Sequence, residues 1–160
     1  MKNIYEQVTR GNRYDFPGAG KHNMEMIKSD VTAKDLPAIE QAFISENHYG
    51  CCLHYGMTLF KLMREAGYEA YIAITKEENP LTGQKTDNHV SVCYIINGER
   101  FIADPVETIK GTDGNFLDIP IEDFRKANGT IWIFDPYGEY GGELFFNGFL
   151  SHPLDVIQGD

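Results

Sequence analysis

Apolar residues between positions 52 and 63 recur at the spacing of one helix face. Offsets of three and four residues place them on a single stripe, which is made up of Cys52, Tyr55, Gly56, Leu59, Phe60 and Met63. The pattern predicts a buried helix that begins near Cys51 and ends at Gly67, a residue type common just past a helix end. Cys52 falls on the stripe at its N-terminal end, whereas Cys51 lies about 100° around the helix.

Alternating apolar and polar residues after this helix predict strands. The runs are 69–75, 89–96, 99–106 and 130–134, with a polar loop over 76–88. Asn97-Gly98 separates the second run from the third, and this dipeptide between alternating runs predicts a two-residue hairpin turn. The polar loop runs directly into His89, so we expect it to border a cleft.

A two-residue turn at Asn97-Gly98 fixes the register of the hairpin. Cys93 then faces Ile102, and Ser91 faces Asp104. Alternation places His89 on the same face as Asp104, as diagonal neighbours about 7–8 Å apart at Cα. The opposite face carries the apolar set Val90, Val92, Tyr94, Phe101 and Ala103. The pattern predicts an imidazole and a carboxylate within hydrogen-bonding reach.

The first part of the chain has a helical pattern. A helix is expected from Leu36, with Thr32 or Asp35 as its cap, and an interruption at 48–50. Residues 1–30 are expected to form an N-terminal arm or a short helix, with a glycine-rich turn at 16–20. The whole chain, 1–160, is predicted to be a single domain. Helices followed by an antiparallel meander predict an α+β fold in which a helix packs against a curved antiparallel β-sheet.

Composition narrows the classes of partner. The 160 residues carry a formal net charge of −10, which argues against nucleic acid and against an anionic membrane surface. The charge is compatible with a basic substrate or partner, although solubility alone is the favoured explanation. No apolar run is long enough for a transmembrane helix, and the N-terminus lacks the apolar core of a signal peptide. A cytoplasmic location is therefore expected, with a secreted effector left open.

Cys52, His89 and Asp104 together supply the parts of a cysteine nucleophile site. A helix N-terminus favours negative charge and so lowers the pKa of a thiol. An adjacent imidazole accepts the thiol proton, and a carboxylate on the far ring nitrogen orients that imidazole. Three cysteines, an odd number, argue against a disulfide framework and favour free thiols.

Two segments resemble the transglutaminase-like superfamily, which has a papain-like fold. "CLHYGMTLFKLMREAGYEAY" is similar to its nucleophile helix, with Gly56, Arg64 and Gly67 in matching places. "NHVSVCYIINGERFIADPV" is similar to its histidine and aspartate strands. The separations of 37 residues from Cys52 to His89 and 15 from His89 to Asp104 are usual for such domains. The resemblance covers 49–106, the expected catalytic core, and it selects Cys52 over Cys51 as the nucleophile.

The resemblance implies acyl transfer on an amide or peptide bond through a thioester at Cys52. Small bacterial members of the superfamily are more similar to hydrolases, so peptidase or deamidase activity is expected, without a cofactor. Two alternatives stay open: a protein-glutamine transamidase, and a binding module that keeps the fold without turnover. The substrate would be a peptide or protein amide.

The sequence departs from the family pattern around the nucleophile. Ser91 stands where family members often have an aromatic residue, and no Trp or Gln precedes the nucleophile. The backbone N–H of Cys52 would be one oxyanion donor. Candidates for substrate binding or for a second donor are Asn47, Tyr49, Cys51 and Ser91, with His48 a further possibility.

Metal binding is not expected from the sequence. No C-x-x-C or H-x-x-x-H pairing is present, and adjacent cysteines on a helix point in different directions. His54 lies about 200° around the helix from Cys52 and is expected to face away from it. The glycine- and aromatic-rich segment 137–149 is expected to cover the sheet, with the lining of a substrate cleft and a dimer contact as alternatives.

Overall fold

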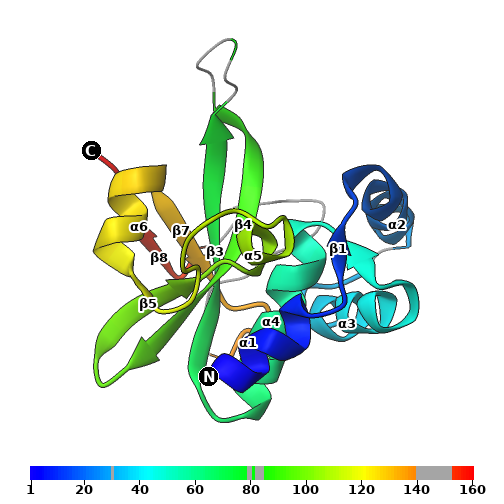
Figure 1. Cartoon of the computed structure of the whole chain (residues 1–160), viewed down its shortest axis with the longest axis horizontal. Coiled ribbons are helices and arrows are strands. Elements are labelled where there is room, and N and C mark those ends of the chain that lie inside the picture. The colour runs from blue at the N-terminus through cyan, green and yellow to red at the C-terminus, as the bar shows by residue number, and fades with distance from the viewer. Residues whose placement is uncertain (30, 79–80, 82–84, 140–152) are drawn as a thin grey trace.

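The fold centres on a curved antiparallel sheet of six strands, in the order β6-β5-β4-β3-β7-β8 (Figure 1). The computed structural model describes residues 1–29, 31–78, 81, 85–139 and 153–160. The strands are β3 (Glu69–Glu78), β4 (Lys85–Ile96), β5 (Glu99–Ala103), β6 (Ile119–Pro120), β7 (Ile131–Phe134) and β8 (Asp155–Ile157). Every neighbouring pair is antiparallel.

Helices cover both faces of this sheet. They are α1 (Lys2–Thr9), α2 (Phe16–Lys28), α3 (Leu36–Asn47), α4 (Cys52–Glu65), α5 (Pro105–Ile109) and α6 (Ile121–Asn128). A parallel pair of short strands, β1 (Arg13–Tyr14) and β2 (Tyr49–Gly50), joins the N-terminal segment to the start of α4. The predicted α+β fold, with the cysteine-bearing helix on a curved antiparallel sheet, is confirmed. None of the helices in the described ranges is long and apolar enough to cross a membrane.

Two apolar clusters follow from the alternation of the strands. The larger one joins α4 to the sheet face that carries Ile72, Ile74, Val90, Val92 and Tyr94. The smaller one packs Ile121 and Phe124 of α6 against the other face, which carries Tyr71, Ala73, Cys93, Ile102 and Ile133. Period-two alternation therefore sends adjacent residues of β4 to different cores.

The predicted hairpin register is confirmed. Asn97 and Gly98 have positive φ values of 52° and 82°, as a type I′ turn requires. Cys93 pairs with Ile102, as the turn demands. The ladder ends one pair earlier than expected, at Val92 and Ala103, so Ser91 and Asp104 are not a ladder pair. Asp104 instead leaves the strand and becomes the residue that precedes α5.

The sequence was misleading in four segments. Residues 16–20 do not form a turn; they begin α2, where Asp15 accepts the N–H of Gly18 and Pro17 occupies the first turn. The 76–88 loop is shorter than expected, because β3 continues to Glu78 and β4 begins at Lys85. Helices α5 and α6 were not predicted. Most of the 137–149 segment lies outside the described residues.

Candidate active site

Cys52 is the first residue of α4, and its side chain is half-buried. The chain enters the helix through Cys51, which has an extended backbone and precedes the first turn. The Cys52 sulfur lies 4.0 Å from the backbone oxygen of Asn88, the residue just before His89. The predicted nucleophile therefore sits at a helix N-terminus, where a thiolate is favoured, and beside the strand that carries the predicted base.

His89 and Asp104 form a buried hydrogen bond. His89 Nε2 lies 2.7 Å from Asp104 Oδ2, and the two residues are 7% and 4% exposed. The diagonal pairing expected from the hairpin is therefore present, although Asp104 sits at the start of α5 rather than in the strand. Because Nε2 contacts the carboxylate, a proton exchanged with a thiol would pass through the other ring nitrogen, Nδ1.

The backbone of Asp104 is held from both sides. Its N–H donates to the backbone oxygen of Phe116 at 2.8 Å. Its carbonyl accepts the hydroxyl of Tyr5 at 3.2 Å, and that hydroxyl also contacts Thr108 Oγ1 at 2.6 Å. Helix α1 thus supports the backbone of Asp104 from 99 residues away along the chain.

A cavity of about 600 Å³ opens beside this histidine–aspartate pair. His89 and Asp104 contribute to its wall, and α6 supplies Asp123 and Phe124. Two further side chains on the wall are charged, the acidic Glu107 and the basic Lys76. Acidic groups thus outnumber basic ones around this cavity.

Cys51 occupies a different environment from Cys52. It is 2% exposed, its sulfur lies 3.3 Å from His54 Nδ1, and Asn23 Nδ2 donates to it at 3.6 Å. The hydrogen bond with Cys52 lowers the pKa of the Cys51 thiol, burial raises it, and the contacts with His54 lower it again, leaving a net downward shift. The two thiols are therefore joined by a hydrogen bond, but Cys52 is the more exposed of the two residues.

The remaining candidate residues contact their own structural neighbours. Asn47 Nδ2 donates to the carbonyl of Phe43 at 2.9 Å, within the same helix. Tyr49 packs edge-on against Phe43, with ring centroids 5.4 Å apart. Ser91 is fully buried and its hydroxyl donates to the carbonyl of Ala73 at 3.5 Å. Cys93 is buried in the α6 core, and burial raises the pKa of its thiol to about 12.

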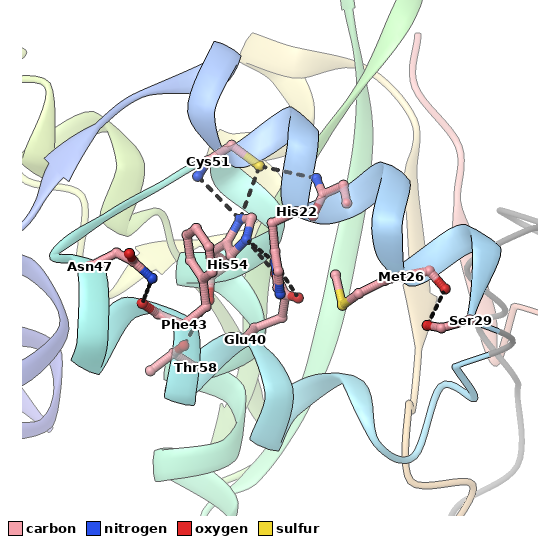
Figure 2. A network of polar contacts seen from close by, with 10 residues as sticks. His22, Met26, Ser29, Glu40, Phe43, Asn47, Cys51, His54 and Thr58 are labelled. Atoms are coloured by element: carbon pink, nitrogen blue, oxygen red, sulfur yellow. Dashed lines mark hydrogen bonds and ion pairs between the residues drawn. The ribbon is translucent and has the colours of Figure 1, made fainter.

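A second polar cluster lies behind Cys51, and the sequence did not predict it. Figure 2 shows His22 of α2, Glu40 of α3 and His54 of α4 pointing toward one another. Burial raises the pKa of Glu40 to about 9, with the charge of Cys51 acting in the same direction. Burial also lowers the pKa of His22, and the neighbouring His54 lowers it further.

No local motif joins these three residues, which come from three separate helices. One signal was present in the sequence. Glu40 stands midway between Leu36 and Ile44 at intervals of four residues, and all three positions are buried. A glutamate on the apolar stripe of a helix is rare without a partner, and the spacing alone indicates a buried carboxylate.

No protein-family model matches the chain, and no curated protein matches it. A solved structure described as a crystal structure of a TGase is similar over 71% of this chain, with a TM-score of 0.45 and 17% sequence identity. This chain spans 27% of the length of that protein.

Proposed function

We propose that this protein catalyses cysteine-dependent acyl transfer on an amide or peptide bond. Cys52 is the nucleophile, His89 the general base and acid, and Asp104 the residue that orients His89. One observation carries the proposal, the buried 2.7 Å hydrogen bond between His89 and Asp104. The residue before His89 is Asn88, and the Cys52 sulfur lies against its backbone oxygen.

The reaction would proceed in two steps. In the first, the sulfur of Cys52 attacks the amide carbonyl while His89 Nδ1 accepts the thiol proton. The tetrahedral intermediate places its oxyanion near the N-terminus of α4, where the backbone N–H of Cys52 is one donor. Its collapse breaks the C–N bond, and the proton held by His89 passes to the leaving amine. A thioester remains on Cys52.

Water completes the proposed reaction. His89 removes a proton from the water that attacks the thioester, and it returns the proton to Cys52 as the carboxylic acid leaves. A primary amine in place of water would give transamidation. The acidic cavity wall and the net charge of −10 favour a substrate with basic groups near the reacting amide.

The testing experiment measures thiol reactivity and needs no substrate. Alkylation by iodoacetamide is followed against pH, and the modified cysteines are identified by mass spectrometry. Cys52 should react first, with an apparent pKa well below the roughly 8.5 of a free thiol. His89→Ala should abolish this advantage. His48→Asn is the matched control: alkylation forms no oxyanion, so a candidate oxyanion donor does not affect it, and Asn tolerates the left-handed conformation at this helix end (φ 58°).

The proposal fails if Cys52 reacts no faster than Cys51, or if its pH profile is the same in His89→Ala. A reactive Cys52 together with no turnover of any peptide or amide would favour the binding module instead. With an active substrate in hand, the acyl product formed in the presence of added lysine separates the two reactions: hydrolysis gives a free carboxylic acid, and transamidation gives a lysine amide, both identified by mass spectrometry.

A further inference from the structure

We propose that His22, Glu40 and His54 form a binding site for one zinc ion. His22 Nδ1 lies 2.9 Å from His54 Nε2. The carboxylate of Glu40 faces both rings, with one oxygen 3.1 Å from His54 Nε2 and the other 3.8 Å from His22 Nδ1. The donor atoms thus converge from α2, α3 and α4 on a single point (Figure 2).

Hydrogen bonds among His22, Glu40 and His54 do not satisfy all of their polar atoms. Two imidazole nitrogens 2.9 Å apart hold one proton between them, because two protons would collide and two lone pairs would repel. The shared ring proton does not serve Glu40, whose side chain is fully buried and whose two oxygens have no hydrogen-bond partner. Burial without a hydrogen-bond partner is costly for a carboxyl group, whether it is charged or protonated. A divalent cation replaces the shared proton and satisfies all three side chains.

The spacing fits the size of zinc. Zinc binds nitrogen and oxygen ligands at about 2.0–2.2 Å in a tetrahedron, which sets neighbouring donors about 3.3–3.5 Å apart. The three distances between the candidate ligand atoms are 2.9, 3.1 and 3.8 Å, and they lie on both sides of this donor-to-donor distance. Two imidazoles with one carboxylate suit zinc or a neighbouring transition metal, whereas calcium and magnesium prefer oxygen ligands alone.

The surrounding residues hold the ligands in place. The ring of Phe43 stacks on His22 at 4.1 Å between centroids and lies against His54 at 4.7 Å. Gly50 closes over His54 so tightly that a Cβ on this glycine would lie 2.8 Å from the histidine Cβ. His54 and Glu40 are inaccessible to solvent, while the side chain of His22 is 19% exposed. A metal ion would therefore reach the site from the side of α2, and its fourth ligand would be water.

The other nitrogen of His54 connects the site to the start of α4. It lies 3.3 Å from the Cys51 sulfur and 3.4 Å from the Cys51 backbone nitrogen. Zinc on Nε2 puts the ring proton on Nδ1, which then donates to the sulfur and no longer accepts from the backbone N–H. Zinc would thus fasten α2 and α3 to the residue that precedes Cys52. The role is structural, and it does not depend on the proposed catalysis.

The test titrates zinc into the whole, tag-free protein after removal of metals with a chelator. Competition with a chromophoric chelator gives the stoichiometry and affinity, and the melting temperature is read in parallel. We expect one equivalent of zinc and a rise in melting temperature. His22→Gln, at the partly exposed edge of the site, should weaken binding at least tenfold and remove that rise. His48→Asn, a histidine substitution outside the cluster, should leave both unchanged.

Cobalt(II) in place of zinc reports on the donor set through its visible spectrum. Tetrahedral nitrogen and oxygen ligation gives moderately intense bands without strong thiolate charge transfer, which is the expected result. The proposal is overturned by no stoichiometric binding to folded wild type, by equal binding to His22→Gln, or by a strong thiolate band, which would make Cys51 a ligand. Glu40→Gln is the second variant, and metal-free folding with lost binding is its expected result.

Discussion

Gly56 lies so close to Val90 that a side chain would not fit between them. A Cβ on Gly56 would be 2.6 Å from Val90 Cγ1. Gly56 follows Cys52 by one helical turn, and Val90 is the residue after His89. The contact therefore sets how closely the cysteine end of α4 approaches the histidine strand.

We expect Gly56→Ala to destabilise the protein by about 1–3 kcal/mol, because the added methyl group overpacks a buried contact. The loss should exceed the gain of about 0.5–1 kcal/mol that alanine normally brings to a helix interior. Urea unfolding measures the change in free energy. Cys52 alkylation in the same variant should slow as α4 moves away from β4.

Gly20→Ala is the control for this prediction. Gly20 also lies inside a helix, α2, but nothing is within 4 Å of the position where its Cβ would be. Alanine should therefore stabilise the protein there. If the two substitutions have the same effect on stability, the close contact at Gly56 does not control the packing of α4.

Elements with a strong local pattern could be predicted from the sequence. The stripe on α4 and the Asn97-Gly98 turn each depend on neighbouring residues, and the turn alone determines which residues pair in β4 and β5. The pairing of His89 with Asp104 followed from that register. The two short helices were missed because α5 has five residues and α6 eight, which leaves little room for a period to show.

Parts of the site that depend on distant segments could not be predicted. Tyr5 supports Asp104 from the first helix, and no pattern near either residue indicates the contact. The cluster of His22, Glu40 and His54 needs the relative placement of three helices, which comes from packing rather than from spacing in the sequence.

Arg64 should matter far more for stability than an exposed arginine. Its guanidinium lies 2.6 Å from Asp135, and the two side chains are 9% and 0% exposed. We expect Arg64→Met to cost about 3–5 kcal/mol, because it leaves a buried carboxylate without its cation. Arg100→Met is the matched control, since its pair with Asp155 is exposed and should contribute at most about 1 kcal/mol. Similar losses in urea unfolding for both variants would contradict this prediction.

Cys93 should resist alkylation for as long as the protein stays folded. It is 1% exposed, and burial raises the pKa of its thiol to about 12, so almost no thiolate is present at neutral pH. Its modification in mass spectra should therefore begin only at urea concentrations that unfold the chain. Modification of native Cys93 at the rate of Cys52 would show that the α6 core opens locally.

Tyr5 should give the folded state a measurable dependence on alkaline pH. Burial raises the pKa of its hydroxyl to about 12 from an unfolded value of 10.0. Between these values the unfolded chain loses the phenolic proton and the folded chain keeps it. Stability therefore falls as pH rises from about 10 to about 12, and the contribution of Tyr5 is complete below pH 10.

Tyr5→Phe should lose about 1 kcal/mol at pH 8, where the hydroxyl bonds to Asp104 and Thr108 are intact. The difference in free energy of unfolding between this variant and wild type, measured in urea, should narrow as pH rises toward 12. Only wild type has this proton to lose. Thr108→Val is the control: it removes one partner of the hydroxyl, keeps the ionisable group, and should keep the alkaline slope. A gap that stays constant with pH would mean that the Tyr5 hydroxyl does not stay protonated in the folded protein, and its support of Asp104 would then fail at high pH.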